Sequence, residues 1–129
     1  MAWQFNVREA VFLQIADRLR WAILDGTYAP DTQFPSVRQL AAEAAVNPNT
    51  MQKALTHLEE EGLLHAHGTI GRFVTSDRAV LDAARERMRR KTVRHWLEEA
   101  RALGLGAEEL IHYIKEVNHD ESNTDPDLQ

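Results

Sequence analysis

The sequence contains no cysteine, which excludes a disulfide framework, a thiolate metal site and a cysteine nucleophile. Its apolar runs are all shorter than the roughly 18 residues of a membrane-spanning helix. The first residues lack the basic and apolar regions of a signal peptide, so a cytoplasmic protein is expected. P-loop, nucleophile-elbow and HExxH motifs are absent as well. These absences argue against an enzyme and against a bound cofactor or metal.

Positive charge is also scarce, because 15 Lys and Arg stand against 20 Asp and Glu and give a net charge of −5. Such a balance is unexpected for a protein that binds nucleic acid. The acidic residues, however, are concentrated at 59–61 and near the C-terminus. Since the local field follows the placement of charges rather than their total, a DNA-binding surface elsewhere in the chain is compatible with this composition.

Residues 34–61 are the most informative stretch, because they predict two short helices joined by a tight turn. Ser36 is a good N-cap for the first helix, and Gln39 completes a capping box with it. Asn47 can cap the second helix, with Pro48 in the first helical position, where its missing N–H costs nothing. The apolar stripes of the two helices comprise Val37, Leu40, Ala41 and Ala44, then Met51, Ala54, Leu55 and Leu58.

The second of these helices has a polar face opposite its apolar stripe. This face carries Asn49, Gln52, Lys53 and Thr56. Asparagine and glutamine can read adenine through two hydrogen bonds, and threonine and lysine can contact bases or phosphates. A helix-turn-helix places such a helix in the major groove of DNA. The alternative is an ordinary helical hairpin whose polar face is merely solvated.

Two strand-like segments follow, at 63–67 and 72–75, and the glycine-bounded turn at 68–71 suits a β-hairpin. A helix, a helix-turn-helix and a hairpin in this order are typical of a winged helix, in which the hairpin is the wing. The hairpin can also cap the core through Leu64 and Phe73. The predicted fold class is mainly α with a small β-hairpin, with a winged helix-turn-helix over residues 1–76.

About half of the chain, residues 11–75, resembles the N-terminal domain of the GntR family of bacterial transcription regulators. The resemblance lies in an ordered series of residues rather than in one motif. The short helical tail that follows is similar to that of the YtrA-like subfamily. The matching residues are 14–20, Ile23, Gly26, Pro30, 35–38, Leu40, Ala41, 46–50, Leu58, Glu59, 61–63, Gly71, Phe73 and Val74.

This resemblance implies DNA contacts from the second helix, from Arg38 and from the wing. The guanidinium of Arg38 suits guanine or phosphate, whereas the alternative is a solvated surface arginine. The wing departs from the family pattern, because His67 and Gly68 replace a common basic pair and Thr69 replaces the first tip glycine. We expect DNA contacts from Ser36, Arg38, Asn47, Asn49, Thr50, Gln52, Lys53, Thr69, Gly71 and Arg72.

Three histidines, His57, His65 and His67, raise the question of a metal site in this region. His65 and His67 share one strand face, because side chains alternate along a strand. No carboxylate or thiolate, however, has a convincing ligand spacing to them. No metal is therefore expected.

The residues before the helix pair are interpreted as scaffold. Residues 12–23 have the period of an amphipathic helix. Trp3, Phe5 and Val7 predict a short strand or an arm ahead of it. Residues 28–32 predict a turn, in which Asp31 stands where the family commonly has glycine.

Residues 77–118 predict a two-helix tail, broken at 104–106, and residues 119–129 predict a disordered acidic end. So small a tail cannot bury its own apolar residues, so we expect a second copy to cover them. The alternative is packing onto the protomer's own winged helix. The expected dimer interface comprises Leu81, Ala84, Met88, Val93, Trp96, Leu97, Ala100, Leu110, Ile111 and Ile114.

The sequence thus predicts a homodimeric, sequence-specific DNA-binding regulator, whose twofold symmetry matches a palindromic operator. The resemblance implies a repressor and, for YtrA-like members, a transporter operon as the target. The alternative is a winged helix that binds proteins without contacting DNA. The tail offers little room for an enclosed effector pocket. The basic run at 85–94 is either a solvated helix face or an additional phosphate contact.

Overall fold

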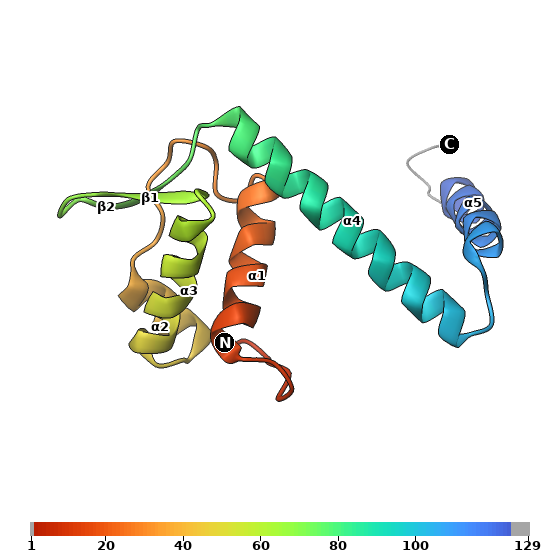
Figure 1. The fold of residues 1–129 in the computed structure, drawn as a ribbon, viewed down its shortest axis with the longest axis horizontal. Helices are drawn as coiled ribbons and strands as arrows, with labels where there is room; N and C mark the ends of the chain where they lie inside the picture. Colours follow the sequence, from red (N-terminus) through yellow and green to blue (C-terminus); the bar gives the residue numbers. More distant parts are fainter. Residues whose placement is uncertain (1, 125–129) are drawn as a thin grey trace. The chain divides into compact units, whose positions relative to one another are not determined.

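The computed structural model describes residues 2–124, and in this range it contains five helices and one antiparallel hairpin (Figure 1). The mainly α fold class with a small hairpin is therefore confirmed. The chain forms two compact units that divide after Arg85. The elements are α1 (Val11–Leu24), α2 (Val37–Ala44), α3 (Pro48–Glu60), β1 (Leu64–His67), β2 (Gly71–Val74), α4 (Arg78–Ala102) and α5 (Ala107–Thr124).

Three helices enclose the core of the first unit. α1 and α3 lie side by side, and α2 packs against α3 (Figure 1). Each helix buries the apolar stripe that its sequence predicts, because residues spaced by three and four lie on one face. The fully buried large side chains are Ile15, Leu19, Ile23, Leu40, Met51, Leu55, Leu58, Leu63, Leu64 and Val74.

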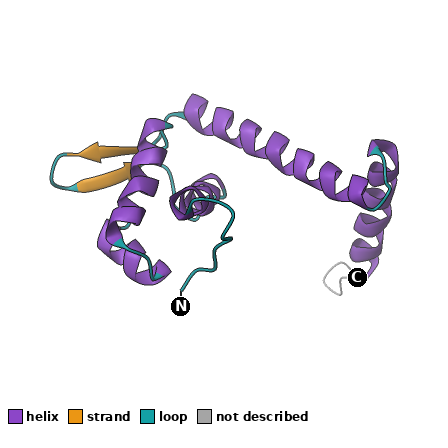
Figure 2. Ribbon diagram, turned by 60° about the horizontal axis from the view of Figure 1, so that its bottom comes forward, coloured by secondary structure: helices purple, strands orange, loops and turns teal. Residues whose placement is uncertain are grey.

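The hairpin extends from the C-terminal end of α3 (Figure 2). Its register pairs Leu64 with Val74 and His67 with Gly71, close to the predicted strands. The segment 31–34 runs along the other edge of β2, where the Asp31 amide donates to the Val74 carbonyl at 2.9 Å and the Phe34 amide to the Arg72 carbonyl at 2.8 Å. The sequence predicted only a turn in this region, because pairing between distant segments leaves no local pattern.

The residues before α1 form an arm that contacts α2 rather than a strand. The Trp3 amide donates to the carbonyl of Ala44 at 3.2 Å. The guanidinium of Arg18 lies over the Trp3 ring, 4.1 Å from its centroid. Of the two predicted alternatives, an arm is therefore the one that the structure contains.

The first turns of α4 belong to the winged-helix unit. Leu81 and Ala84 are buried there, and the Arg85 Nε donates to the Leu24 carbonyl at 3.3 Å. The first compact unit therefore extends beyond the predicted boundary after residue 76. The start of α4 packs with the winged helix although it follows the wing in sequence.

The second unit contains the rest of α4 and α5. Gly104 adopts a left-handed φ of 81°, and the Leu105 amide donates to the Ala100 carbonyl at 2.9 Å, so the predicted break at 104–106 is confirmed. α5 continues to Thr124, so the prediction of disorder is wrong for 119–124. Contacts one turn apart accompany the extension, such as the Ser122 hydroxyl donating to the Asn118 carbonyl at 2.9 Å. The rest of the predicted disordered end, 125–129, lies outside the described residues.

Between residues 2 and 124, none of the helices has both the length and the apolar character that crossing a bilayer requires.

Candidate nucleic-acid interface

The turn between α2 and α3 has the local structure that its sequence predicts. The Ser36 hydroxyl accepts from the Gln39 amide while the Gln39 side chain accepts from the Ser36 amide, which is a complete capping box. Asn47 caps α3, because its Oδ1 accepts from the Asn49 amide at 2.8 Å. Ala45, which ends α2, adopts a left-handed conformation at φ 57° and ψ 48°. These local hydrogen bonds set where α3 begins and therefore which of its residues stand in the first turn.

Replacing Ala45 with glycine is expected to raise the free energy of unfolding by about 0.5–1 kcal/mol. The left-handed conformation costs a residue with a Cβ about 1–2 kcal/mol, and glycine avoids this cost. The greater backbone freedom of glycine in the unfolded chain offsets about half of the stability gained. The Ala45 side chain is exposed, so no packing is lost. The control is Ala42→Gly in the middle of α2, which should lose about 0.5–1 kcal/mol. Urea unfolding of both variants measures the difference, and a loss of stability in Ala45→Gly would contradict the expectation.

The polar face of α3 is exposed, as a base-reading helix requires. Asn49, Gln52, Lys53 and Thr56 are all exposed, and Thr50 is half-buried. The Gln52 amide donates weakly to the Thr56 hydroxyl at 3.3 Å, an exposed contact that is easily exchanged. The Lys53 ammonium lies 5.1 Å from the centroid of the Phe12 ring. That cation–π contact holds the charge of Lys53 beside the N-terminal turn of α1.

Arg38 lies on the exposed side of α2. Within residues 2–124 its guanidinium has neither an ion pair nor a hydrogen bond to the protein. All five of its N–H donors are therefore available to an external acceptor. Among the predicted contact residues, this is the strongest donor that the fold leaves free.

A groove of about 530 Å³ separates the start of α2 from the hairpin. The predicted residues Ser36, Gly71 and Arg72 line it together with Gln33 and Ile70. The tertiary structure thus brings together residues that are more than 30 positions apart in the sequence. The remaining wing residue, Thr69, is exposed in the hairpin turn.

The hairpin turn is held by a side chain that the sequence did not single out. The Gln33 amide donates to the Ile70 carbonyl at 2.9 Å, and a Cβ built on Gly71 would lie 3.1 Å from the same nitrogen. Gly71 also has a φ of 127°, which residues with a Cβ rarely adopt. Gly71 therefore allows the backbone of the wing to adopt this conformation.

Arg72 occupies a different position from Arg38. Its Nε donates to the Glu59 carboxylate on α3, and the ion pair is partly buried. The guanidinium that was expected to contact DNA thus also joins the wing to α3 through its Nε. The sequence signal for this pairing is the acidic run at 59–61, but the sequence does not show which arginine neutralises it.

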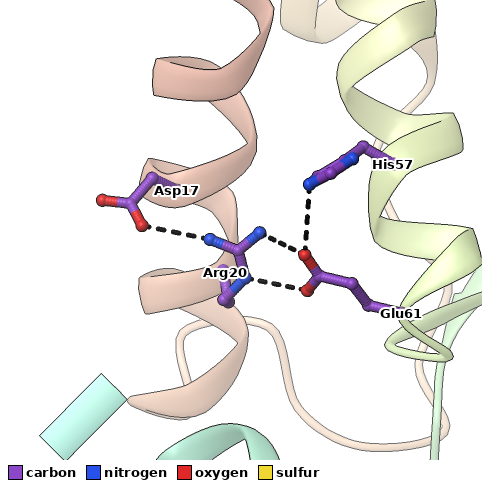
Figure 3. Close-up of polar contacts among 4 residues, drawn as sticks. All are labelled: Asp17, Arg20, His57 and Glu61. Atoms are coloured by element: carbon purple, nitrogen blue, oxygen red, sulfur yellow. Dashed lines mark hydrogen bonds and ion pairs between the residues drawn. The ribbon is translucent and has the colours of Figure 1, made fainter. Parts of the chain in front are cut away.

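A second ion-pair cluster joins α1 to the C-terminal end of α3 (Figure 3). Arg20 donates from Nε to the Glu61 carboxylate at 2.8 Å and from Nη1 to Asp17 at 3.0 Å. His57 Nε2 lies 3.3 Å from Glu61. Burial by itself lowers the pKa of Arg20, but the hydrogen bonds and negative charges of Glu61 and Asp17 outweigh this effect and raise the pKa. The cluster fixes the C-terminal end of α3 against α1, away from the first turn of α3.

Replacing Arg20 with glutamine is expected to lower the free energy of unfolding by about 1–3 kcal/mol. The Arg20 and Glu61 side chains are only 15% and 24% exposed, so the substitution leaves the poorly solvated Glu61 carboxylate with His57 beside it but without its arginine partner. The control is Arg8→Gln, at an exposed position ahead of α1, which should change stability by less than about 0.5 kcal/mol. Urea unfolding of the two variants tests the expectation, and equal values for both would contradict it.

His65 and His67 contact each other and Phe73 through their rings, whereas His57 on α3 contacts Phe12. The centroids of His65 and His67 are 4.8 Å apart, and that of His67 lies 5.0 Å from Phe73. His57 packs edge-on against Phe12 at 6.2 Å. Over residues 2–124, no three His, Asp or Glu side chains converge as metal ligands would.

The geometry of this unit agrees with its relatives. Residues 12–74 match the family of bacterial regulatory proteins called gntR. The HTH-type transcriptional regulator Rv1152 of Mycobacterium tuberculosis (strain ATCC 25618 / H37Rv) is 32% identical over 112 residues, which cover 81% of this chain and 85% of the relative. The HTH-type transcriptional repressor YtrA of Bacillus subtilis (strain 168) is 29% identical over 111 residues, 85% of each chain.

A solved structure matches both units of the chain. A GntR family transcriptional regulator from Listeria monocytogenes superposes with a TM-score of 0.78 at 27% identity, and the match covers 87% of this chain and 98% of that one. Fold, sequence and the helix-turn-helix geometry thus agree. The chain belongs to the gntR family of bacterial regulatory proteins and is a DNA-binding transcriptional regulator.

Proposed function

We propose that this regulator is a homodimeric repressor that binds a palindromic operator. One observation carries the proposal: α3 and α2 expose the polar groups that read DNA, and the fold leaves the strongest of these donors, Arg38, without a protein partner in the described chain. Exposed, unengaged donors of these types suit the base edges and phosphates of a duplex.

The proposed contacts follow from the position of each residue on its helix. Asn49 and Gln52 on α3 are proposed to read base edges, and Lys53 a phosphate. The Thr50 hydroxyl, in the first turn of α3, is proposed to contact a phosphate, because the positive end of the helix dipole attracts anions. The fork of Arg38 is proposed to contact guanine or a phosphate. Further proposed contacts are Ser36, Asn47, Thr69 and Gly71; Arg72 is assigned to the support of the wing.

The second unit supports the proposed dimer. Val93, Trp96, Ile111 and Ile114 are between 45% and 54% exposed in the single chain, which is unusual for so many large apolar residues in one short segment. A second copy of the same surface would cover them with twofold symmetry. We propose an interface built on these four residues with Leu97 and Leu110 at its edge.

Four residues of the predicted interface are already buried without a second copy. Leu81 and Ala84 pack within the winged-helix unit, as the alternative of packing onto the protomer's own domain predicts for these two positions. Met88 and Ala100 are 7% and 5% exposed in the single chain. We therefore leave these four out of the proposed interface, which is narrower than the sequence suggested.

Repression is supported by the similarity to YtrA, which is named as a transcriptional repressor. A dimer that covers promoter DNA excludes polymerase, and this mode of action needs no further chemistry from the protein. By its resemblance to YtrA-like regulators, we propose a transporter operon as the target.

The proposal is tested by footprinting the wild-type protein on fragments of its host's genome and by sedimentation in the absence of DNA. We expect a dimer and a protected site made of two inverted half-sites, one turn of the duplex or a multiple of it apart. A dimer that protects no fragment would favour a winged helix that binds only proteins. A monomer that protects single half-sites would remove the dimer from the proposal and keep DNA binding.

A further inference from the structure

One side of α4 carries a row of basic residues, which we call the basic stripe. None of them is among the proposed operator contacts. Six basic residues and one acidic residue lie between 85 and 94, which gives this segment a charge of +5 in a protein whose net charge is −5. Five of the six are arginines, whose planar forks suit phosphate oxygens. The basic stripe comprises Arg87, Arg90, Lys91, Arg94 and Arg101.

Ion pairs within α4 neutralise only part of this charge. Glu86 pairs with Arg90 at 2.9 Å and with Arg89 at 3.9 Å, and Asp82 pairs with Arg85 at 3.4 Å. Arg87, Arg94 and Arg101 are different, because none of them has an ion pair or a hydrogen bond within residues 2–124. All three side chains are exposed.

The spacing along the basic stripe places like charges next to each other. Arg87 stands three and four residues before Arg90 and Lys91, and both of these are again three or four residues before Arg94. Neighbours at these spacings lie on one helix face and repel each other when their charges are equal. Glu98 lies on the same side of the helix, but the described chain contains no ion pair between it and an arginine. Arg90 and Lys91 already have partners within the chain, so an anion from outside would relieve the repulsion at Arg87 and Arg94.

The three unpaired arginines form a straight line. They are seven residues apart, so Arg87 and Arg101 are separated by about 21 Å along the axis at about 1.5 Å per residue. Duplex DNA carries about 12 phosphate charges over that length. Val93 and Trp96, which belong to the proposed dimer interface, point about 100° or more away from this line. Leu97, at the edge of that interface, points about 60° away from Arg94, so the line of arginines borders the apolar side that a second copy would cover without lying in it.

We propose that the basic stripe binds the phosphate backbone of DNA, in addition to the contacts proposed for α2 and α3. The partner is a duplex of any sequence, because guanidinium groups on a straight helix face can reach phosphates without entering a groove. This inference rests on the proposed operator binding and extends it from specific to nonspecific contacts. It also explains how a protein with a net negative charge holds DNA.

The test is the salt dependence of operator binding by the triple variant Arg87→Gln, Arg94→Gln, Arg101→Gln. On a duplex that extends roughly ten base pairs, one helical turn, beyond each side of the operator, the slope of log K against log salt should become shallower. We expect a change of about one for each arginine that contacts a phosphate. The ratio of operator to unrelated-DNA affinity should stay the same, because these contacts read no bases.

The matched control removes three positive charges elsewhere, with Arg78→Gln, Arg89→Gln and Lys115→Gln, and should keep the wild-type slope. Equal flattening by the control would show a general charge effect and overturn the inference. An unchanged slope in the triple variant, with wild-type operator affinity, would overturn it and leave the proposed function intact. Absence of DNA binding by the wild-type protein would remove both. Circular dichroism verifies that α4 is formed in each variant.

Discussion

The Ile114→Glu variant is expected to be a monomer at concentrations where the wild-type protein is a dimer. Ile114 is 45% exposed in the single chain, so the protomer should tolerate glutamate. Twofold symmetry introduces two carboxylates into the proposed interface, and burying each unpaired charge costs several kcal/mol. We expect the dimer dissociation constant to rise by at least about a thousandfold, or about 4 kcal/mol. Sedimentation velocity over a range of concentrations measures it.

The same variant should lose most of its affinity for a two-half-site operator. A dimer binds its second half-site as an intramolecular event, which strengthens binding by about 10²–10⁴ without a new contact. A monomer lacks this gain, although its α3 and Arg38 are unchanged. Binding to a single half-site should therefore stay close to that of the wild type, and mobility shift with the two probes separates the effects.

A suitable control for the dimer prediction is His119→Glu. His119 is exposed and points about 110° away from the midpoint between Ile111 and Ile114 around the axis of α5. The substitution adds a carboxylate to the same helix but should leave the dimer intact. If Ile114→Glu sediments as the wild type does, another surface must hold the copies together and the proposed interface is wrong.

Arg38→Ala is expected to weaken operator binding by about 1–3 kcal/mol, or about 5- to 150-fold. The reason is that Arg38 has no partner in the described chain, so its donors are engaged only when DNA is bound. Stability should change by less than about 0.5 kcal/mol, because an exposed, unpaired side chain contributes little to folding. Mobility shift and urea unfolding together distinguish a lost contact from a lost fold.

The Arg38→Lys variant shows what the arginine recognises. Lysine keeps the charge but cannot form the two parallel hydrogen bonds of a guanidinium with guanine. If Arg38 reads a base, Arg38→Lys should lose nearly as much affinity as Arg38→Ala and relax the preference at one position of each half-site. If it contacts a phosphate, Arg38→Lys should retain most of the affinity. Binding that is unchanged in both variants would exclude Arg38 from the interface.

Arg72 provides an internal comparison for Arg38, since both were predicted to contact DNA. Of the two, only Arg72 is paired with a carboxylate in the described residues, that of Glu59. The pair ties the wing to α3, so its removal should affect the position of the hairpin before it affects any direct contact. The two arginines therefore differ in role: Arg72 supports the wing because a carboxylate lies beside it, and Arg38 has no such carboxylate in the described chain.

The sequence by itself determined the parts of this protein that depend on neighbouring residues. The capping box at Ser36 and Gln39, the cap at Asn47 and the buried stripe of α3 were predicted and are confirmed, because caps and helical periodicity act over three or four positions. The order of helices and hairpin was also sufficient to predict a winged helix. The same local reasoning predicted disorder at 119–124, where a polar composition proved compatible with a continuing helix.

Only the tertiary structure decided which side chains are free to bind. It paired segment 31–34 with β2, engaged Arg72 with Glu59 and left Arg38 unpaired. It also buried Leu81 and Ala84 in the winged-helix unit, although their spacing is that of an exposed tail helix. The physical reason is that burial and ion pairing depend on which distant segments of the chain pack together. The residues around a surface arginine are the same whether or not a carboxylate from another element pairs with it.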